Sequence, residues 1–419
     1  MLREFLFYVI DFIKGSRVRS HYKSVKFTIE RSNLSNVSLE KLMNHACKEV
    51  DYYINIFPIL QNFPIINKTI IRDNFVQFQA KNYVTKPKIS MTTSGSTGTP
   101  FTVYQDLNKK ARNHADTLYF GEIAGYILGN KLYYLKIWAK QKMASPWVYK
   151  IQNIIPVDVI DLNEGKVRQL VKEMENTNKK ISLLGYVSAL EHFIRYAEKN
   201  KIERIKANIV SVITMSEGLH KETKIKLEKF FECPVVSRYS NLENGIIAQQ
   251  ERNSELFLVN TASYYVEIFH PTKEELLPNG ELGRIVVTDL YNYAMPIIRY
   301  DTGDFGILIE KDGKTYLQSV EGRKLDLLYD TKGNMVSSYI MYKNMWQYTE
   351  IEQYQLVQTH IKSYEFKINC PSGFKRQEQL VAEFKSYLGD DADFKVIHVD
   401  EIPLLDSGKR RKTVNLYYK

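Results

Sequence analysis

Cysteine is scarce in this sequence of 419 residues, which contains only Cys47, Cys233 and Cys370. The three lie far apart and no pair has CxxC spacing, which makes a zinc site built from cysteines a poor interpretation. An odd and sparse set of cysteines is typical of reduced thiols, so the sequence predicts a cytoplasmic protein. Cys233 stands beside Pro234 between an expected helix and an expected strand, and we interpret it as a core residue.

Long hydrophobic runs are also absent. The first apolar stretch, residues 2–13, is interrupted by Arg3, Glu4 and Asp11 and is too short and too charged to span a bilayer. It lacks a small-residue cleavage site, so we expect no signal peptide. Apolar residues recur in it at the spacing of a helix, namely Leu2, Phe5, Leu6, Val9, Phe12 and Ile13.

This apolar stripe has two interpretations. Because Arg17, Arg19 and Lys23 follow it, the stripe could lie on an anionic membrane surface, as a peripheral membrane contact. Alternatively it docks on the protein's own core, which is the more frequent arrangement for such a stripe. We favour docking on the core.

The chain further lacks a Walker A motif, an internal repeat, a long low-complexity linker and a recognised nucleic-acid-binding module. A hydrophobic content of 44% and a charged content of 25% are ordinary for a globular protein with two or more domains. The net charge of +10 is compatible with anionic partners such as nucleotides, nucleic acid or acidic lipid, or simply with a basic solvated surface. Since the charges are dispersed, we expect no nucleic-acid partner.

Helical and strand patterns alternate from about residue 160. Three expected helices and three expected strands succeed one another at 165–177, 180–186, 189–200, 207–215, 221–232 and 233–240. Such alternation predicts a parallel sheet with crossover helices. Strand-rich segments follow to about residue 320, whereas residues 27–80 are expected to be mostly helical. Beyond residue 326 the pattern restarts with strands around one helix at 375–389, which predicts a small α+β domain.

One loop is rich in glycine and hydroxyl side chains, with the sequence TTSGSTGTPF at residues 92–101. Glycines let the backbone approach a ligand, and successive amides together with Ser and Thr hydroxyls form an anion-binding concavity. A phosphate cradle after a strand is one interpretation, and a hydrophilic hairpin is the other. The candidate phosphate-binding residues are Thr93, Ser94, Gly95, Ser96, Thr97, Gly98 and Thr99.

Two later segments place polar residues where a nucleotide could meet them. In SRYSNLENG, residues 237–245, Tyr239 could stack on a base and Glu243 could hold Mg²⁺ with phosphate oxygens. In RYDTGD, residues 299–304, Asp304 could accept both hydroxyls of a ribose. The plainer alternatives are an ordinary loop with a capping asparagine and a turn whose aspartates bond their own backbone.

Two basic residues near the C-terminus are further candidates. Arg323, in GRKLD at 322–326, could bond ribose or phosphate, or could form a surface salt bridge. Lys409, in PLLDSGKRRK at 403–412, could neutralise charge that develops on phosphate and carboxylate oxygens. Alternatively Lys409 belongs to a solvated basic tail or a weak nucleic-acid patch.

Taken together, the order and spacing of these motifs resemble the adenylate-forming superfamily of acyl-CoA synthetases, adenylation domains and luciferases. The chain is most similar to its short branch, the phenylacetate-CoA ligase-like and capsule-biosynthesis CapK-type proteins, over roughly residues 85–419. The resemblance implies an α/β fold with a large N-terminal domain of mixed sheets and crossover helices, and a small mobile α+β lid. It implies domains at 1–325, of which 1–85 is helical, and 326–419, with a hinge at Asp326.

The resemblance also implies the roles of individual residues. The loop at 92–101 would grip the β- and γ-phosphates of ATP, Glu243 would bind Mg²⁺, and Lys409 would assist adenylation. Tyr186 and Ser188 would border the acyl pocket, although Ser188 could instead cap a helix. The residues implied to contact adenine and ribose are Ser216, Glu217, Gly218, Tyr239, Ser240, Asp304 and Arg323.

The chain departs from the family's pattern at three positions. Leu242 stands where relatives carry a hydroxyl that meets the α-phosphate or the acyl group, Asp301 stands where relatives often carry arginine, and Lys412 replaces a usual arginine. None of these departures removes Asp304, Glu243 or Lys409. They bear on the substrate and the partner more than on nucleotide binding.

The sequence therefore predicts an AMP-forming ligase that uses ATP and Mg²⁺ to activate a small carboxylic acid and passes the acyl group to an acceptor, most simply the thiol of CoA. Alternatives are transfer to an amine or a carrier protein in surface-polysaccharide biosynthesis, or a nucleotide-binding homologue without catalysis. Similar short ligases are commonly homodimers, so a homodimer is a further expectation.

Overall fold

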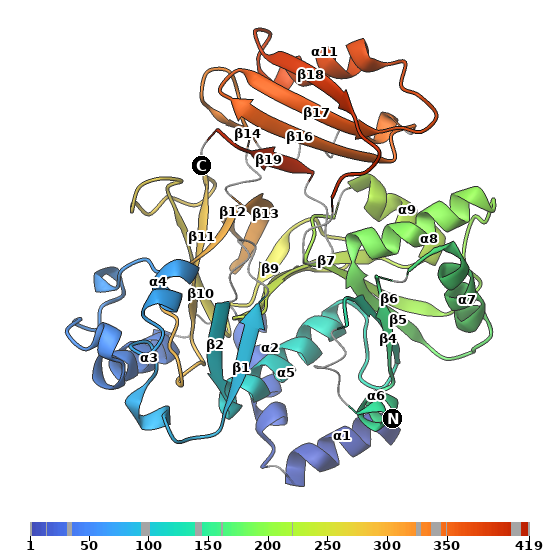
Figure 1. The fold of residues 1–419 in the computed structure, drawn as a ribbon. Helices are drawn as coiled ribbons and strands as arrows, with labels where there is room; N and C mark the ends of the chain where they lie inside the picture. Colours follow the sequence, from blue (N-terminus) through green and yellow to red (C-terminus); the bar gives the residue numbers. More distant parts are fainter. Residues whose placement is uncertain are drawn as a thin grey trace. The chain divides into compact units, whose positions relative to one another are not determined.

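The structure, a computed structural model, describes residues 2–13, 15–31, 36–93, 101–138, 145–160, 162–219, 221–323, 328–336, 345–348, 350–403 and 412–417. They form two compact units (Figure 1). The first unit comprises Met1–Leu219, Lys224–Thr302 and Gly306–Ser319, and the second comprises His220–Thr223, Gly303–Phe305 and Val320–Lys419. The predicted boundary at residues 325 and 326, including the hinge residue Asp326, lies outside the described residues and stays a prediction.

The largest sheet contains eleven strands in the order β10-β11-β12-β13-β9-β8-β7-β6-β5-β3-β4. Its half from β4 to β7 is parallel, whereas β7, β8, β9 and β13 pair antiparallel, as do β10 and β11. The strands are β3 (Lys131–Lys136), β4 (Ile154–Asp158), β5 (Ile181–Tyr186), β6 (Ile209–Met215), β7 (Val235–Asn241), β8 (Gly245–Gln250), β9 (Phe257–Val259), β10 (Tyr264–Phe269), β11 (Leu282–Asp289), β12 (Tyr300–Lys311) and β13 (Lys314–Arg323).

Three crossover helices connect strands of the parallel half, as the alternating pattern predicts. They are α7 (Glu164–Glu175), α8 (Val187–Lys199) and α9 (Lys221–Phe231). Their apolar faces pack on β5, β6 and β7 in one core that includes Leu183, Val212, Phe193 and the predicted core residue Cys233. The predicted α/β class with a mixed sheet is confirmed, and burial of both strand and helix faces explains the continuous apolar runs in these strands.

Several helices and strands were not predicted from the sequence. The parallel half begins earlier than residue 160, with β3 and β4, and β8 pairs antiparallel with β7 on its other side. The helix α5 (Leu107–Ile123) was also missed, because its buried face carries the charged residues Lys109, Arg112 and Asp116. Asp106 caps this helix by accepting the backbone N–H of Lys109 at 2.8 Å.

The N-terminal part contains less helix than the 27–80 pattern predicts. Two helices, α2 (Arg17–Glu30) and α3 (Asn36–Glu49), are followed by the short 3₁₀ turns η1 (Asp51–Tyr53) and η2 (Leu60–Asn62) and by α4 (Lys68–Asp73). The predicted apolar stripe of α3 is buried, and residues 50–80 fill the same core with rings rather than with a helix face. The buried members are Leu39, Leu42, Val50, Tyr53, Phe63 and Phe78.

The first helix, α1 (Leu2–Ile13), forms where the sequence predicts it, but its apolar side chains do not dock on the core. Phe12 and Ile13 are 75% and 77% exposed, and their neighbours on the same face are exposed too. The opposite side carries Asp11, whose carboxylate accepts the backbone N–H groups of Val18 and Arg19 at 3.0 and 2.9 Å. This buried carboxylate fixes α1 to the start of α2 through its polar side, so the prediction that the apolar stripe docks on the protein's core is wrong.

The second unit contains a four-stranded sheet in the order β18-β17-β16-β19. Its strands are β16 (Gln353–His360), β17 (Ser363–Asn369), β18 (Asp393–His398) and β19 (Thr413–Asn415), and a smaller pair is β14 (Leu328–Tyr329) with β15 (Met335–Val336). The helix α11 (Gln377–Leu388) buries Leu380 and Phe384 against Phe366 of β17.

In the part of the chain that the structure describes, no helix has both the length and the apolar composition to cross a bilayer.

Candidate nucleotide and acyl site

Three parallel strands end side by side at the edge of the sheet where the sequence places its ligand-binding candidates. The register aligns Tyr186 of β5 with Met215 of β6, and Met215 with Arg238 of β7. Residues 216–218 therefore leave β6 between the ends of β5 and β7, where Ser188 and Tyr239 lie. The carboxyl ends of parallel strands are where open α/β sheets bind ligands, so the structure brings these candidates to one such edge.

Glu217 connects two of these strand ends. Its carboxylate accepts the backbone N–H of Ser188 at 2.7 Å and the Ser188 hydroxyl at 3.0 Å. The carboxylate thus caps the first turn of α8, where negative charge is favourable. The alternative in which Ser188 caps this helix is wrong: the N-cap residue is Tyr186, which makes no side-chain cap bond, and Ser188 is a donor. Burial raises the pKa of the neighbouring Tyr186 hydroxyl.

Glu243 is a buried carboxylate with two partners. It lies in the turn between β7 and β8 and is 1% exposed. The Tyr300 hydroxyl donates to Oε1 of Glu243 at 2.6 Å, and the Lys68 ammonium lies 3.1 Å from the same oxygen. Lys68 is about one third exposed at the start of α4, so its side chain reaches the carboxylate from the solvent side.

The glycine-rich loop ends beside Glu243. The strands β1 (Lys88–Thr93) and β2 (Phe101–Asp106) pair antiparallel, with Thr93 opposite Phe101, and residues 94–100 connect them. The Phe101 ring lies parallel to the Tyr300 ring at a centroid distance of 6.4 Å, and the Tyr300 hydroxyl bonds Glu243. The phosphate-binding candidates 94–99 lie outside the described residues, as does the Thr93 side chain, but the last residue of the loop belongs to the Glu243 cluster.

Hydrogen bonds from neighbouring side chains fix the backbone of the turn that contains Glu243. The Gln105 amide donates to the Glu243 carbonyl at 2.8 Å, and the Tyr264 hydroxyl donates to the Asn244 carbonyl. Gly245 has a φ of +117°, and a Cβ there would lie 2.8 Å from the Asn113 side chain, so glycine is required. Asn241 accepts the Asn244 N–H at 2.9 Å, which is the capping asparagine of the plainer interpretation.

The other candidates have separate surroundings. The Tyr239 hydroxyl donates to Thr302 at 3.2 Å and the residue is buried, whereas Asp304 is half-buried in β12 after Gly303. Lys409 and the side chain of Arg323 lie outside the described residues. Of the departures from the family's pattern, Leu242 is 46% exposed and Asp301 pairs with Arg284 at 2.7 Å.

Sequence reasoning missed Tyr300, Lys68 and Gln105 as partners of Glu243. Tyr300 stands in the quoted segment RYDTGD, so its place next to the candidate Asp304 was an available signal. Nothing in the local sequence distinguishes Lys68 or Gln105, because each contacts Glu243 from a distant part of the chain.

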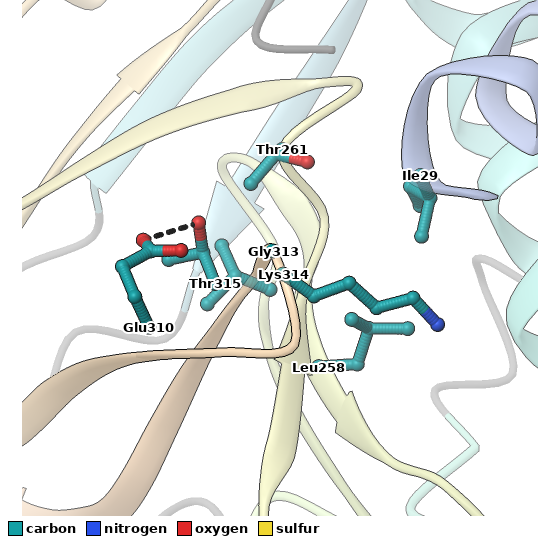
Figure 2. Close-up of a pocket in the computed structure, with 8 residues that line it drawn as sticks. Ile29, Leu258, Thr261, Glu310, Gly313, Lys314 and Thr315 are labelled. Carbon is teal, nitrogen blue, oxygen red and sulfur yellow. Dashed lines mark hydrogen bonds between the residues drawn. The ribbon is translucent and has the colours of Figure 1, made fainter. Parts of the chain in front are cut away.

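A small pocket of about 80 Å³ lies elsewhere in the first unit (Figure 2). Ile29, Leu258 and Lys314 line it, and Glu310 there accepts the Thr315 hydroxyl at 2.7 Å. Ligand sites are usually several hundred Å³, so this pocket is too small for a nucleotide, and it contains none of the predicted site residues.

Comparison with known proteins finds relatives of the whole chain and of its C-terminal part. Residues 328–416 match the family model of the CapK C-terminal domain. Protein CapK of Staphylococcus aureus is 23% identical, over 96% of this chain and 94% of CapK. The chain is thus similar to CapK over almost the whole length of both proteins. Phenylacetate-coenzyme A ligase of Pseudomonas putida is 28% identical to this chain over 143 residues, which cover 30% of the chain and 32% of the ligase.

Solved structures share the fold of this chain. The crystal structure of 2-hydroxyisobutyryl-CoA ligase in the postadenylation state with R3-HIB-AMP has a TM-score of 0.70 at 15% identity, covering 90% of this chain and 88% of that chain. ATP-bound MatB from Rhodopseudomonas palustris has a TM-score of 0.57 at 15% identity, covering 77% and 66%. The predicted resemblance to adenylate-forming ligases of the CapK-type and phenylacetate-CoA ligase-like branch is therefore confirmed, whereas the roles of the individual residues stay predictions.

Proposed function

We propose that this protein is an AMP-forming ligase that activates a carboxylic acid with ATP and transfers the acyl group to an acceptor. The observation that carries the proposal is the Glu243 cluster. A buried carboxylate, the end of the glycine-hydroxyl loop and the start of β12, the strand that contains Asp304, are joined there through Phe101 and Tyr300. The CapK and CoA ligase relatives support the same reaction class.

The reaction has two steps. In the first, a carboxylate oxygen of the substrate forms a bond to the α-phosphorus of ATP, the bond from that phosphorus to the bridging oxygen breaks, and pyrophosphate leaves. The protein contributes position and charge neutralisation, the latter through Lys409. In the second, an acceptor attacks the acyl carbon, its proton is released and AMP leaves. The C-terminal domain turns about Asp326 between the steps, so that one lid assembles two sites.

The side chains near Glu243 decide whether this site is suited to Mg²⁺. Among the described residues no group of three or more His, Cys, Asp and Glu side chains is placed to hold a metal ion. Mg²⁺ in nucleotide sites, however, is usually held by one or two carboxylates, with phosphate oxygens and water as the other ligands. Glu243 fits this donor set, and Mg²⁺ bound there would neutralise charge on the phosphates. Lys68, which is about one third exposed, would exchange its carboxylate partner for a phosphate.

The adenosine part of ATP would bind along the carboxyl edge of β6 and β7. Because Glu217 is engaged in capping α8, the backbone of residues 216–218 is the part of that segment that would contact adenine. Tyr239 would stack on the base next to Ser240, and Asp304 and Arg323 would bind the ribose. Tyr186 and Ser188 would border the acyl group at the end of β5.

The acceptor is most simply the thiol of CoA, since the named relatives and neighbours include CoA ligases. A carrier-protein thiol or an amine acceptor in surface-polysaccharide biosynthesis is the alternative suggested by the likeness to CapK. Incubation with ATP, Mg²⁺, the acid and either CoA or a panel of amines, followed by mass spectrometry of the products, distinguishes these acceptors.

The assay that tests the first step is exchange of labelled pyrophosphate into ATP, with a panel of carboxylic and amino acids. We expect exchange that depends on one class of acid and on Mg²⁺, because formation of acyl-AMP is reversible. Omission of the acid is the control. Two observations favour a nucleotide-binding homologue without catalysis: Leu242 lacks the family's hydroxyl, and Lys68 already neutralises Glu243. Measurable ATP binding without exchange for any acid would support that second function and contradict the first.

A further inference from the structure

Arg238 is a buried cation without an acidic partner among the described residues. It is 8% exposed on β7, directly before Tyr239. Its Nε donates to Oε1 of Gln249 at 2.8 Å, and within the described part of the chain this is its one hydrogen bond. Burial lowers the pKa of its guanidinium to about 10. The two terminal nitrogens, which could bind an anion, therefore have no bond from the described residues.

The buried arginines Arg112 and Arg299 each have an acidic partner, which Arg238 lacks among the described residues. Arg112 lies 3.6 Å from the Asp116 carboxylate, and Arg299 lies 3.2 Å from Glu267. Both are as buried as Arg238, and both are neutralised within the protein. Since removing a cation from water is unfavourable unless it is paired, Arg238 is the buried arginine of the described residues that calls for a counter-charge from a ligand.

Arg238 lies where the acid substrate would bind. Its register neighbour is Met215, which is aligned in turn with Tyr186, the residue at the end of β5. The Tyr134 hydroxyl approaches the Met215 sulfur at 3.9 Å, and the charge of Arg238 acts against the burial that raises the pKa of Tyr134 to about 12. Tyr134 and Tyr186 keep part of their surface exposed, so the cluster of Arg238, Tyr134, Met215 and Tyr186 is reached from their side.

We propose that Arg238 binds a second carboxylate of the substrate, so that the acid activated by this protein is a dicarboxylic acid. The inference rests on the proposed function. A guanidinium binds a carboxylate through two parallel N–H···O bonds, and Gln249 holds Nε while leaving both terminal nitrogens for such a pair. The first carboxylate forms the bond to the α-phosphorus and pyrophosphate leaves, while the second stays ionised on Arg238 and does not react.

The test compares each dicarboxylic acid with its own monomethyl ester in the pyrophosphate exchange assay. Malonate, succinate and glutarate, each paired with its half-ester, vary the distance between the two groups. For the wild-type protein we expect kcat/KM to be about 100-fold or more higher for one diacid than for its half-ester, as for loss of a buried ion pair. Arg238→Gln should remove this preference, and Arg238→Lys should restore part of it.

Arg195→Gln is the matched control, because Arg195 is exposed on α8 and should leave the preference unchanged. The wild-type comparison does not depend on whether a variant folds. Equal exchange with diacids and half-esters, or a diacid preference that survives in Arg238→Gln, overturns the inference and leaves the proposed function in place. Absence of exchange with every acid contradicts the proposed function, and the inference with it.

A second, independent observation concerns the surface of α1. Its exposed apolar side chains continue onto α6 (Pro146–Gln152), because Arg3 of α1 donates to the carbonyls of Lys150 and Ile151 at 2.6 and 3.3 Å, and the two helices lie side by side (Figure 1). We name this surface the N-terminal apolar face. Its exposed members are Phe5, Leu6, Val9, Ile10, Phe12, Ile13, Trp147, Val148 and Ile151.

Cations are exposed on the helices next to this face. Arg17, Arg19 and Lys23 are exposed on α2, which begins directly after α1, and Lys150 is exposed on α6. Of the two acidic residues of α1, Asp11 is buried and engaged with the start of α2, and Glu4 in the first turn is half-buried, so the cations outnumber the acidic groups near this face. An apolar helix face with an aromatic ring at its edge and a basic border is complementary to a lipid surface of negative charge.

The geometry therefore points to binding of the N-terminal apolar face to the surface of an anionic lipid bilayer. Neither helix is long enough to cross the bilayer, so the face would insert between the headgroups only. Binding of this kind would hold the protein at a membrane. It would not involve the residues of the proposed ligase site, which lie at the carboxyl ends of β5, β6 and β7.

Sedimentation with vesicles tests this proposal. We expect the wild-type protein to sediment with vesicles of phosphatidylcholine and phosphatidylglycerol, and to a smaller extent with phosphatidylcholine alone, with binding reduced by high salt. The double variant Phe12→Ser with Ile13→Ser should lose sedimentation, whereas Val76→Ser, which changes a side chain that is also 77% exposed, should not. If the same amount of protein sediments with and without vesicles, the proposal is overturned. The proposal is also overturned if the wild-type protein self-associates without lipid and the double variant does not.

Discussion

Replacing Lys409 by alanine is expected to reduce acid-dependent pyrophosphate exchange about 100-fold or more, the usual cost of removing a donor that stabilises developing charge. ATP binding, measured by equilibrium dialysis, should change little, because the candidate residues for the phosphates, adenine and ribose lie elsewhere in the chain. The physical reason is that the ammonium interacts most strongly with oxygens whose charge changes during bond formation.

A half-reaction separates this role from a general loss of structure. The Lys409→Ala protein should still convert chemically prepared acyl-AMP and the acceptor into product, because Lys409 is withdrawn in the second step of the proposed mechanism. Lys395→Ala, an exposed lysine on β18 of the same unit, is the matched control and should retain full exchange. Full exchange by Lys409→Ala would refute the assigned role.

Replacing Glu243 by glutamine is expected to abolish most exchange and to raise the Mg²⁺ concentration needed for the remainder. A carboxylate that holds a catalytic metal contributes several kcal/mol to the transition state, which corresponds to about 100-fold or more in rate. The glutamine keeps the size of the side chain and can still accept the Tyr300 hydroxyl bond. The charge partner of Lys68 is lost, but Lys68 is partly exposed and can be solvated.

Two comparisons make this result specific. Glu203→Gln, at an exposed glutamate of the same unit, should leave both the rate and the Mg²⁺ dependence unchanged. Circular dichroism and thermal unfolding should show that Glu243→Gln is folded, with a loss of about 1–3 kcal/mol for an altered buried hydrogen-bonded group. An unchanged Mg²⁺ dependence in a folded Glu243→Gln protein would exclude Glu243 as the metal ligand.

The fold was predictable where local periodicity and burial agree. In residues 165–240 the helix period and the apolar strand runs alternate cleanly, so β5, β6 and β7 with their crossover helices follow from the sequence, whereas β3 and β4 of the same parallel half do not. It was not predictable for α5, whose buried face carries Lys109, Arg112 and Asp116. Lys109 is neutralised by Asp289, and Ser263 hydrogen-bonds to the Arg112–Asp116 pair, so both of these partners are remote in sequence. For α1 the helix was predicted correctly and its apolar face was assigned to the wrong surroundings.

For the candidate site as well, some residues could be predicted from the sequence and others could not. Glu243 and Tyr239 were chosen as candidates from their place near a strand end, and residues 216–218 from the family resemblance; the structure places all of them at the carboxyl ends of β6 and β7. Their partners were not, since Tyr300 meets Glu243 across 57 positions and Gln105 meets it across 138. The missing acid partner of Arg238 was equally invisible, because absence of a contact among the described residues has no local sequence signal.

The amino-acid sequence alone determined the class of fold, the positions of most helices and strands, and the motif residues, because these depend on short-range periodicity and on residue type. The tertiary structure decided which side of α1 is buried, which side chains neutralise Glu243, and that Glu217 rather than Ser188 caps α8. Those outcomes depend on which distant segments come within a few ångströms, and that is set by the packing of the whole sheet and its helices.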